Sequence, residues 1–194
     1  LPTYEWLHLH HEDFTGQYGK FWSSYRNASW SKAQVAEAEE MASKHGFATV
    51  AELKLAVTKK IRDFTVGGGF LFAMCSATDS YDIAMAADGT DICEYMFDGD
   101  PIDPGAQAKL DYTKTFAFKD FNIEQNPMVY EVSSIDVDPI SRNVTEENDL
   151  FALNEFSAKW DVIPAILTQN HERIIKGFMG QTTAFHKEQI KSSV

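Results

Sequence analysis

Cysteine, basic charge and long apolar runs are all scarce in this 194-residue sequence. The two cysteines, Cys75 and Cys93, form neither a CxxC pair nor a disulfide-rich framework, and they leave the redox compartment open. With 17 Lys and Arg against 29 Asp and Glu, the formal net charge is −12, which argues against nucleic acid and anionic membrane surfaces as partners. No apolar run approaches the roughly 18 residues that cross a membrane, so we expect no membrane insertion.

The sequence has the composition of a globular protein, with 44% hydrophobic and 13% aromatic residues. At this length we expect a single domain over residues 1–194, with a core at 1–95 and a β-rich extension at 96–194. The N-terminus lacks the basic and then apolar pattern of a targeting signal. Because Leu1 opens inside a strand-like pattern without an initiator Met, we expect a fragment or processed form of a longer chain, and composition leaves the compartment open.

Strand and helix patterns alternate in the first half. Alternating apolar and polar residues predict a strand at 4–10, and a continuous apolar run predicts a central, doubly covered strand at 70–74. Helices are expected at 31–44, at 50–65 after a capping box of Thr49 and Glu52, and from Asp79 or Ser80 to about 87. This order predicts a doubly wound, flavodoxin-like α/β sheet whose functional crevice lies at the carboxyl ends of its strands.

The pattern changes after residue 95. Glycine and proline make 98–111 loop-like, and short β-type runs follow at 114–121, 128–133, 151–157, 162–168 and 174–185. These runs predict added strands, which would form the β-rich extension.

Cys75 is the sharpest catalytic candidate. It stands on a tight turn between a strand and a helix, where the helix N-terminus favours a thiolate and the N–H of Ser76 can hold an oxyanion. A nucleophilic cysteine also requires a base, and His11 or Glu12 would serve if folding brings it close. The alternative is that Cys75 is a small buried hydrophobe at the end of a core strand. Cys93 is expected to be structural.

The histidines near the N-terminus form a second candidate group. His8 and His10 share one face of the expected strand, a spacing that suits two imidazoles on one zinc ion. The alternative is a hydrogen-bonded histidine pair with His11 in solvent.

Further polar residues are candidates for binding a cation or a substrate. Asp98, Asp100 and Asp103 lie around Gly99 at a spacing that a calcium ion could use, although the pattern favours a solvated acidic turn. Side chains at expected strand and helix ends would line a polar pocket for a small molecule such as a sugar or an amide. These substrate-binding candidates are His10, Asp79, Gln169, His171 and Gln181.

Several stretches carry a resemblance to known families. The turn at 67–79 resembles that of trehalose-utilisation (ThuA-like) proteins, a branch of the class I glutamine-amidotransferase-like fold, which carry a His where Cys75 stands. The whole chain is similar to a bacterial family commonly labelled asparagine synthetase B. The stretches shared with that family are 6–21, 96–101, 114–121, 168–171 and 176–185.

The resemblance implies an exported protein, periplasmic or secreted, with an amidotransferase-like fold. It also implies a longer chain whose late Gly-Gly-His-Asp segment would supply the catalytic histidine. Synthetase chemistry is not expected, because Gly67-Gly68-Gly69 precedes a strand, whereas a phosphate-binding loop follows one. Two functions stay open: a cysteine-dependent amide hydrolase for a small polar substrate, and a non-catalytic carbohydrate- or ligand-binding module. Oligomeric state is not indicated.

Overall fold

The computed structural model describes residues 4–137, 150–152, 174–176 and 185–191. These residues combine six α-helices with short strands, so the chain belongs to the general α/β class. They fall into two compact units, one within Leu1–Asp136 and Phe185–Val194 and the other within Val137–Ala184. In the second unit, strand β3 (Leu150–Ala152) pairs antiparallel with β4 (Ile174–Lys176). Residues 96–136 therefore share a unit with the expected core.

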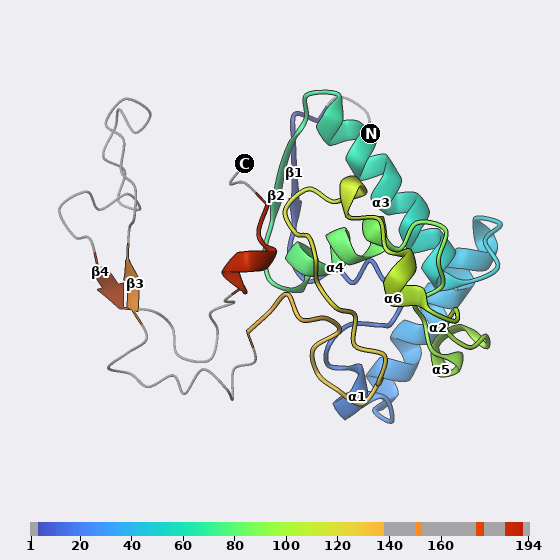
Figure 1. Cartoon of the computed structure of the whole chain (residues 1–194). Coiled ribbons are helices and arrows are strands. Elements are labelled where there is room, and N and C mark those ends of the chain that lie inside the picture. Colours follow the sequence, from blue (N-terminus) through green and yellow to red (C-terminus); the bar gives the residue numbers. More distant parts are fainter. Residues whose placement is uncertain (1–3, 138–149, 153–173, 177–184, 192–194) are drawn as a thin grey trace. The chain divides into compact units, whose positions relative to one another are not determined.

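Strands β1 (Trp6–Leu9) and β2 (Phe70–Ala73) pair in parallel, as the two sequence patterns predicted (Figure 1). On one face Leu9 is buried, and Leu71 and Ala73 pack against the same hydrophobic cluster. On the opposite face Trp6 and Phe70 are exposed. The expected central strand with helices on both faces is therefore not what the described residues show: there β2 belongs to a two-stranded sheet with one open face. The doubly wound topology is not seen in this part of the chain.

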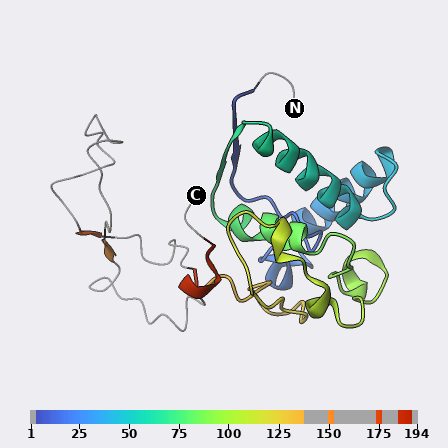
Figure 2. The same ribbon diagram turned by 45° about the horizontal axis from the view of Figure 1, so that its top comes forward.

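The helices of the first unit follow the sequence signals closely. Thr49 accepts a hydrogen bond from the Glu52 N–H, and the Glu52 side chain bonds back to Thr49, which completes the predicted capping box. Helices α2 and α3 pack together, and α3 packs against α4 (Figures 1 and 2). The helices are α1 (Trp22–Tyr25), α2 (Ser29–Lys44), α3 (Val50–Val66), α4 (Ser76–Ala86), α5 (Tyr95–Asp98) and α6 (Ala106–Lys109).

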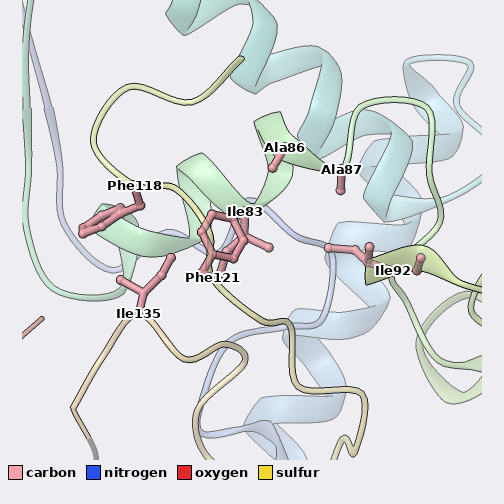
Figure 3. Close-up of a cluster of buried hydrophobic side chains, with 8 residues drawn as sticks. Ile83, Ala86, Ala87, Ile92, Phe118, Phe121 and Ile135 are labelled. Carbon is pink, nitrogen blue, oxygen red and sulfur yellow. The ribbon is translucent and has the colours of Figure 1, made fainter. Parts of the chain in front are cut away.

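Helix α4 occupies the centre of this unit and begins at Ser76, earlier than the predicted Asp79 or Ser80. Nine of its residues are buried, so it is surrounded on all sides. Ile83 and Ala86 join one hydrophobic cluster with Phe118, Phe121 and Ile135 (Figure 3). Residues on the other side of α4 join a second cluster beneath the β1–β2 sheet. Burial of these two clusters fixes α4 in place, and with it the turn at Cys75.

The second half of the sequence departs from the β-rich prediction over residues 96–137, whereas β3 and β4 overlap the runs predicted at 151–157 and 174–185. Over 114–121 the chain forms the end of the 3-10 helix η1 (Tyr112–Lys114) and a single bridge of Phe118 with Ile190. Over 128–133 it forms only a bridge of Ser133 with Ile123. Side chains and loop turns, rather than strand ladders, satisfy this backbone. The 3-10 helix η2 (Lys187–Gln189) lies near the C-terminus, and the predicted run at 162–168 lies outside the described residues. Among the helices that the structure describes, none has the length and apolar character of a membrane span.

Candidate functional site

Cys75 lies between the end of β2 and the start of α4, and its side chain is exposed. Its backbone has φ 51° and ψ −139°, a conformation that residues with a side chain rarely adopt. Such strain costs about 1–3 kcal/mol and persists only where the surrounding structure enforces it. The N–H groups of Ala77 and Thr78 bond to the carbonyls of Met74 and Cys75. This arrangement leaves the Ser76 N–H as the turn's candidate oxyanion donor.

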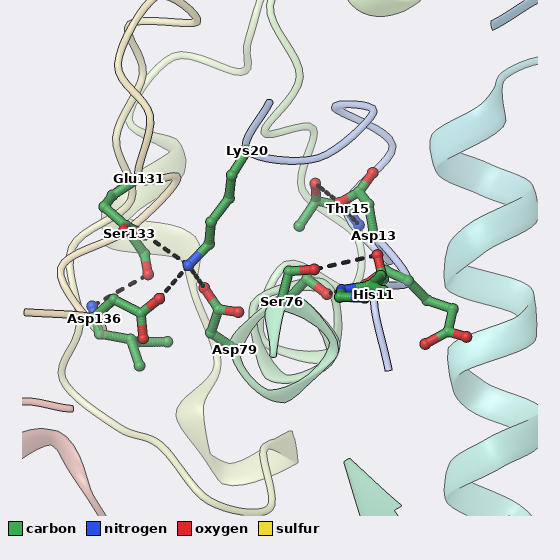
Figure 4. Close-up of polar contacts among 12 residues, drawn as sticks. His11, Asp13, Thr15, Lys20, Ser76, Asp79, Glu131, Ser133 and Asp136 are labelled. Carbon is green, nitrogen blue, oxygen red and sulfur yellow. Dashed lines mark hydrogen bonds and ion pairs between the residues drawn. The ribbon is translucent and has the colours of Figure 1, made fainter. Parts of the chain in front are cut away.

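The loop after β1 is tied to the first turn of α4. The Ser76 hydroxyl donates to the His11 carbonyl at 3.2 Å, and the Ser80 hydroxyl donates to the Glu12 carbonyl at 2.9 Å (Figure 4). The Glu12 carboxylate accepts from the His10 N–H at 2.6 Å. These bonds place the backbone of His11 and Glu12 beside the first turn of α4.

Asp13 organises the rest of this loop. Its carboxylate accepts from the Thr15 hydroxyl at 2.6 Å and from the backbone N–H groups of Thr15, Gly16 and Tyr18 at 3.0–3.1 Å. Gly16 has φ +86°, and a Cβ there would lie 2.7 Å from the Cα of Ala51 on α3. The loop therefore packs directly on α3, which fixes where Tyr18 and Lys20 leave it.

Among the described residues, the groups of three or more potential metal ligands include no histidine. The His8 and His10 rings lie 6.2 Å apart and both side chains are exposed, whereas the His10 and His11 rings lie 3.7 Å apart. Among the described residues, no hydrogen bond joins a histidine to the Cys75 sulfur. The substrate-binding candidates Gln169, His171 and Gln181 lie outside the described residues.

The carboxylates of Asp98 and Asp103 bond to nearby groups of the protein. Asp98 accepts from the Asp100 N–H at 3.1 Å, and Asp103 pairs with Lys109 at 3.1 Å. Where the structure describes the chain, Asp98 instead gathers with Asp91 and Cys93. Burial raises the pKa of the Cys93 thiol, which donates a hydrogen bond to the Thr15 carbonyl at 3.3 Å. Cys93 is a packed, protonated thiol here, in keeping with the structural role that we expected.

A buried ionic cluster lies on the other side of the α4 N-terminus. The Lys20 ammonium lies 3.1 Å from Asp79 and 2.6 Å from Glu131, and it also contacts Asp136 (Figure 4). We call these four residues the Lys20 cluster. Three carboxylates share one ammonium, so the cluster carries an excess of negative charge.

Protonation of the Lys20 cluster follows from that excess. Burial raises the pKa of Asp79 to about 7, with Lys20 opposing the shift and Asp136 adding to it. Burial likewise raises the pKa of Glu131. The surrounding carboxylates raise the pKa of Lys20 despite its burial, so the ammonium stays charged. Burial therefore makes the protonated form of Asp79 more favourable than it is for a carboxyl in water.

Tyr130 connects the cluster to the Cys75 turn. Its neighbour Glu131 belongs to the cluster. Burial raises the pKa of Tyr130, the charge of Glu131 adds to this shift, and a negative charge on Cys75 would make a smaller addition. The Tyr130 ring also packs edge-on against Phe21, with ring centroids 5.4 Å apart. An exposed thiol, a partly exposed phenol and a buried charge cluster thus surround one end of α4.

Sequence reasoning missed Lys20, Glu131 and Asp136, and it assigned Asp79 to substrate binding. The structure places Asp79 at 1% exposure and engages it with Lys20. One signal was available: an acidic residue inside a small-residue helix that must be buried requires a compensating partner, either hydrogen-bond donors or a cation such as a lysine. The sequence did not indicate which lysine supplies it.

Comparisons with models of known families, with curated proteins and with solved structures find no match to this chain.

Proposed function

We propose that this protein is a cysteine-dependent hydrolase that cleaves an amide bond in a small polar molecule. The observation that carries the proposal is the conformation of Cys75: an exposed thiol held at positive φ on a sharp strand-to-helix turn. Nucleophiles in several hydrolase folds are presented on such strained turns, with the adjacent backbone N–H forming an oxyanion hole. A merely structural cysteine does not require this geometry.

The reaction follows from the groups at the turn. The Cys75 sulfur attacks the amide carbonyl carbon, and the Ser76 N–H stabilises the negative charge on the oxygen. The C–N bond then breaks, and ammonia or an amine leaves with a proton delivered by a general acid. Water adds to the resulting thioester and releases the carboxylic acid and the thiol. His11 is the proposed proton carrier, because Ser76 ties its backbone to the same turn.

The proposal extends to the fold and the setting of the chain. A parallel β1–β2 pair with α4 leaving the strand end is the unit from which a doubly wound, amidotransferase-like sheet is built. We include that fold, its β-rich extension and an exported location as parts of the proposal, supported by the resemblance at the turn. A small polar amide is the proposed substrate class.

One observation favours the alternative of a binding module. Within the described residues, the Cys75 thiol makes no hydrogen bond to a histidine, although a working nucleophile and its base approach to about 3 Å in the reactive complex. A protein that keeps the turn but binds its ligand without cleavage would have this arrangement.

Ammonia release from a panel of small amides, including glutamine and asparagine, tests the proposal. Substituting Cys75→Ala should lower the rate by at least about a hundredfold. The matched control is Cys93→Ala, which alters the other thiol of the chain and should leave the rate within a fewfold of the parent if the variant folds. Intact mass should show a thioester adduct on the parent and none on Cys75→Ala. Binding of an amide without ammonia release or adduct would establish the binding module instead.

A further inference from the structure

A cavity of about 670 Å³ lies away from Cys75, between the loop at Tyr18, the junction of α2 with α3, and α5. Its volume is in the range of small-molecule pockets, roughly 300–1,000 Å³. Three of its lining residues are aromatic, namely Tyr18, Phe47 and Phe97. Two are acidic, namely Glu39 and Asp98, and none of the lining residues is Lys, Arg or His. The wall of the cavity is therefore aromatic and negatively charged.

The placement of Tyr18 in this wall is enforced by its loop. Its backbone has φ +61°, which is uncommon for a residue with a side chain, and its N–H donates to Asp13 at 3.0 Å. The close approach of Gly16 to Ala51 anchors the same loop on α3. Such local strain is maintained by the surrounding structure and is concentrated at functional sites.

The Tyr18 hydroxyl is an unsatisfied polar group. It is buried and has no hydrogen-bond partner among the residues that the structure describes. Buried hydroxyls in folded proteins nearly always have a partner, so an unpaired one requires an explanation. A ligand that carries a hydrogen-bonding group and occupies the cavity would supply the missing partner.

The charge around Tyr18 identifies what kind of ligand fits. Burial first, and then the negative charge of Glu39, raise the pKa of Tyr18 to about 12, and Asp98 adds to the shift. Both carboxylates of the wall therefore act on the phenol. A positively charged nitrogen would be attracted by both carboxylates and by the faces of the aromatic rings.

We propose that this cavity binds a small organic cation, in which an ammonium group lies between Glu39 and Asp98 and its carbon substituents pack on the aromatic wall. A bare metal ion fits less well. Cys93 lies close to Asp91 and Asp98, but its thiol stays protonated and donates a hydrogen bond to the Thr15 carbonyl. Aromatic walls, in addition, give a hydrated metal ion no ligands.

A matched pair of probes separates charge from shape: choline, and its neutral isostere 3,3-dimethylbutan-1-ol. Each is titrated into the whole chain at neutral pH and low salt, and binding is followed by NMR shifts. We expect choline to bind at least about tenfold more tightly than the alcohol. The double substitution Glu39→Gln, Asp98→Asn should abolish most of that preference. Added salt should weaken choline binding and leave the alcohol unaffected.

Two variants make the result interpretable. Glu37→Gln with Glu40→Gln removes the same charge from exposed positions of α2 that do not line the cavity, and it should retain the full preference. Phe47→Leu keeps an apolar side chain but removes one aromatic face, and should weaken choline binding more than binding of the alcohol. Equal affinity for the two probes, no binding of choline, or an unchanged preference after Glu39→Gln, Asp98→Asn would each overturn the proposal. None of these outcomes depends on Cys75, so the hydrolase proposal is tested separately.

Discussion

Asp79 and Asp82 lie about one turn apart on α4 and are both 1% exposed, yet their carboxylates are held by different means. The Asp82 carboxylate accepts from the backbone N–H groups of three consecutive residues at 2.7–2.8 Å. Those donors are Phe116, Ala117 and Phe118. The Asp79 carboxylate faces the Lys20 ammonium, which it shares with two further acids.

Asp82 is therefore a structural anion whose charge is fully solvated by the protein, whereas Asp79 belongs to a cluster with more negative than positive charge. At Asp82, neutral donors from a single loop solvate the carboxylate, and it joins residues 116–118 to α4 as a fixed connection. At Asp79, the charges come from three separate parts of the chain and leave an excess of carboxylates. The Asp82 side should therefore be sensitive to the loss of one acceptor, and the Asp79 side to the loss of one cation and to pH.

Removing the cation should have the largest effect. Lys20→Met keeps most of the apolar stem but leaves three buried carboxylates without an ammonium. Breaking a buried ion pair from one side costs about 3–5 kcal/mol of unfolding free energy. Urea denaturation at pH 7.5 would measure the loss, and lowering the pH should recover part of it, because the carboxyls then take up protons.

The control for that variant is Lys59→Met. Lys59 also pairs with an aspartate, Asp88 at 2.7 Å, but its side chain is 46% exposed. Exposed pairs contribute at most about 1 kcal/mol. Equal losses from the two variants would show that the Lys20 cluster is not the tightly buried network described above.

Removing the Asp82 carboxylate should have the next largest effect. Asp82→Ala leaves three buried N–H groups without a partner, and we expect a loss of about 3 kcal/mol in unfolding free energy. Asp82→Asn retains one carbonyl oxygen and should lose roughly half as much. Amide hydrogen exchange at Phe116, Ala117 and Phe118 should accelerate in both variants. Unchanged exchange there would mean that residues 116–118 are held by something other than Asp82.

Sequence reasoning predicted the local elements of the first unit better than the long-range contacts of either buried carboxylate. The strand at 70–73, the turn at Cys75 and the helix capped by Thr49 follow from local patterns, and the structure confirms them. The parallel pairing with β1 also follows, because strands separated by helices are expected to pair in parallel in an α/β sheet. Such signals lie within a few residues of one another.

The Lys20 cluster and the Asp82 loop could not be found in this way. Lys20, Asp79 and the pair Glu131 and Asp136 come from three distant segments of the sequence, and no local pattern links these segments. The strand predicted at 114–121 failed because its backbone donors turn inward to Asp82 instead of to a neighbouring strand. Tertiary contacts overrode the β-type pattern at that point.

The pH dependence of stability should distinguish Asp79 from Asp82. Because burial raises the pKa of Asp79 to about 7, the folded state binds its proton more tightly than the unfolded state does. The stability it contributes is complete below about pH 4 and is lost as the pH rises through 7. Linkage gives a loss of about 2 kcal/mol between pH 5 and pH 7.5 for this carboxyl. The Lys20 ammonium opposes the shift, while Asp136 reinforces it.

Asp79→Asn tests this assignment through the change of stability with pH, and not through the stability at a single pH. Urea midpoints of the variant should fall less between pH 5 and pH 7.5 than those of the parent. A parallel pair of slopes would show that Asp79 does not bind its proton more tightly in the folded state than in the unfolded state.

The smallest effect is expected from the lysine nearest Asp82. The Lys191 ammonium donates to the carbonyls of Tyr112 at 2.5 Å and Thr115 at 2.7 Å. Burial raises the pKa of Asp82; the three backbone hydrogen bonds oppose that shift, and the charge of Lys191 opposes it less than they do. Because Asp82 is solvated by neutral donors, Lys191→Met should cost only about 1 kcal/mol, the value of the hydrogen bonds to the two carbonyls. The control Lys187→Met changes an exposed lysine of η2 and should be nearly neutral. A loss from Lys191→Met as large as that from Lys20→Met would show that Asp82 also depends on a cation. Asp79 and Asp82 would then be stabilised by the same means.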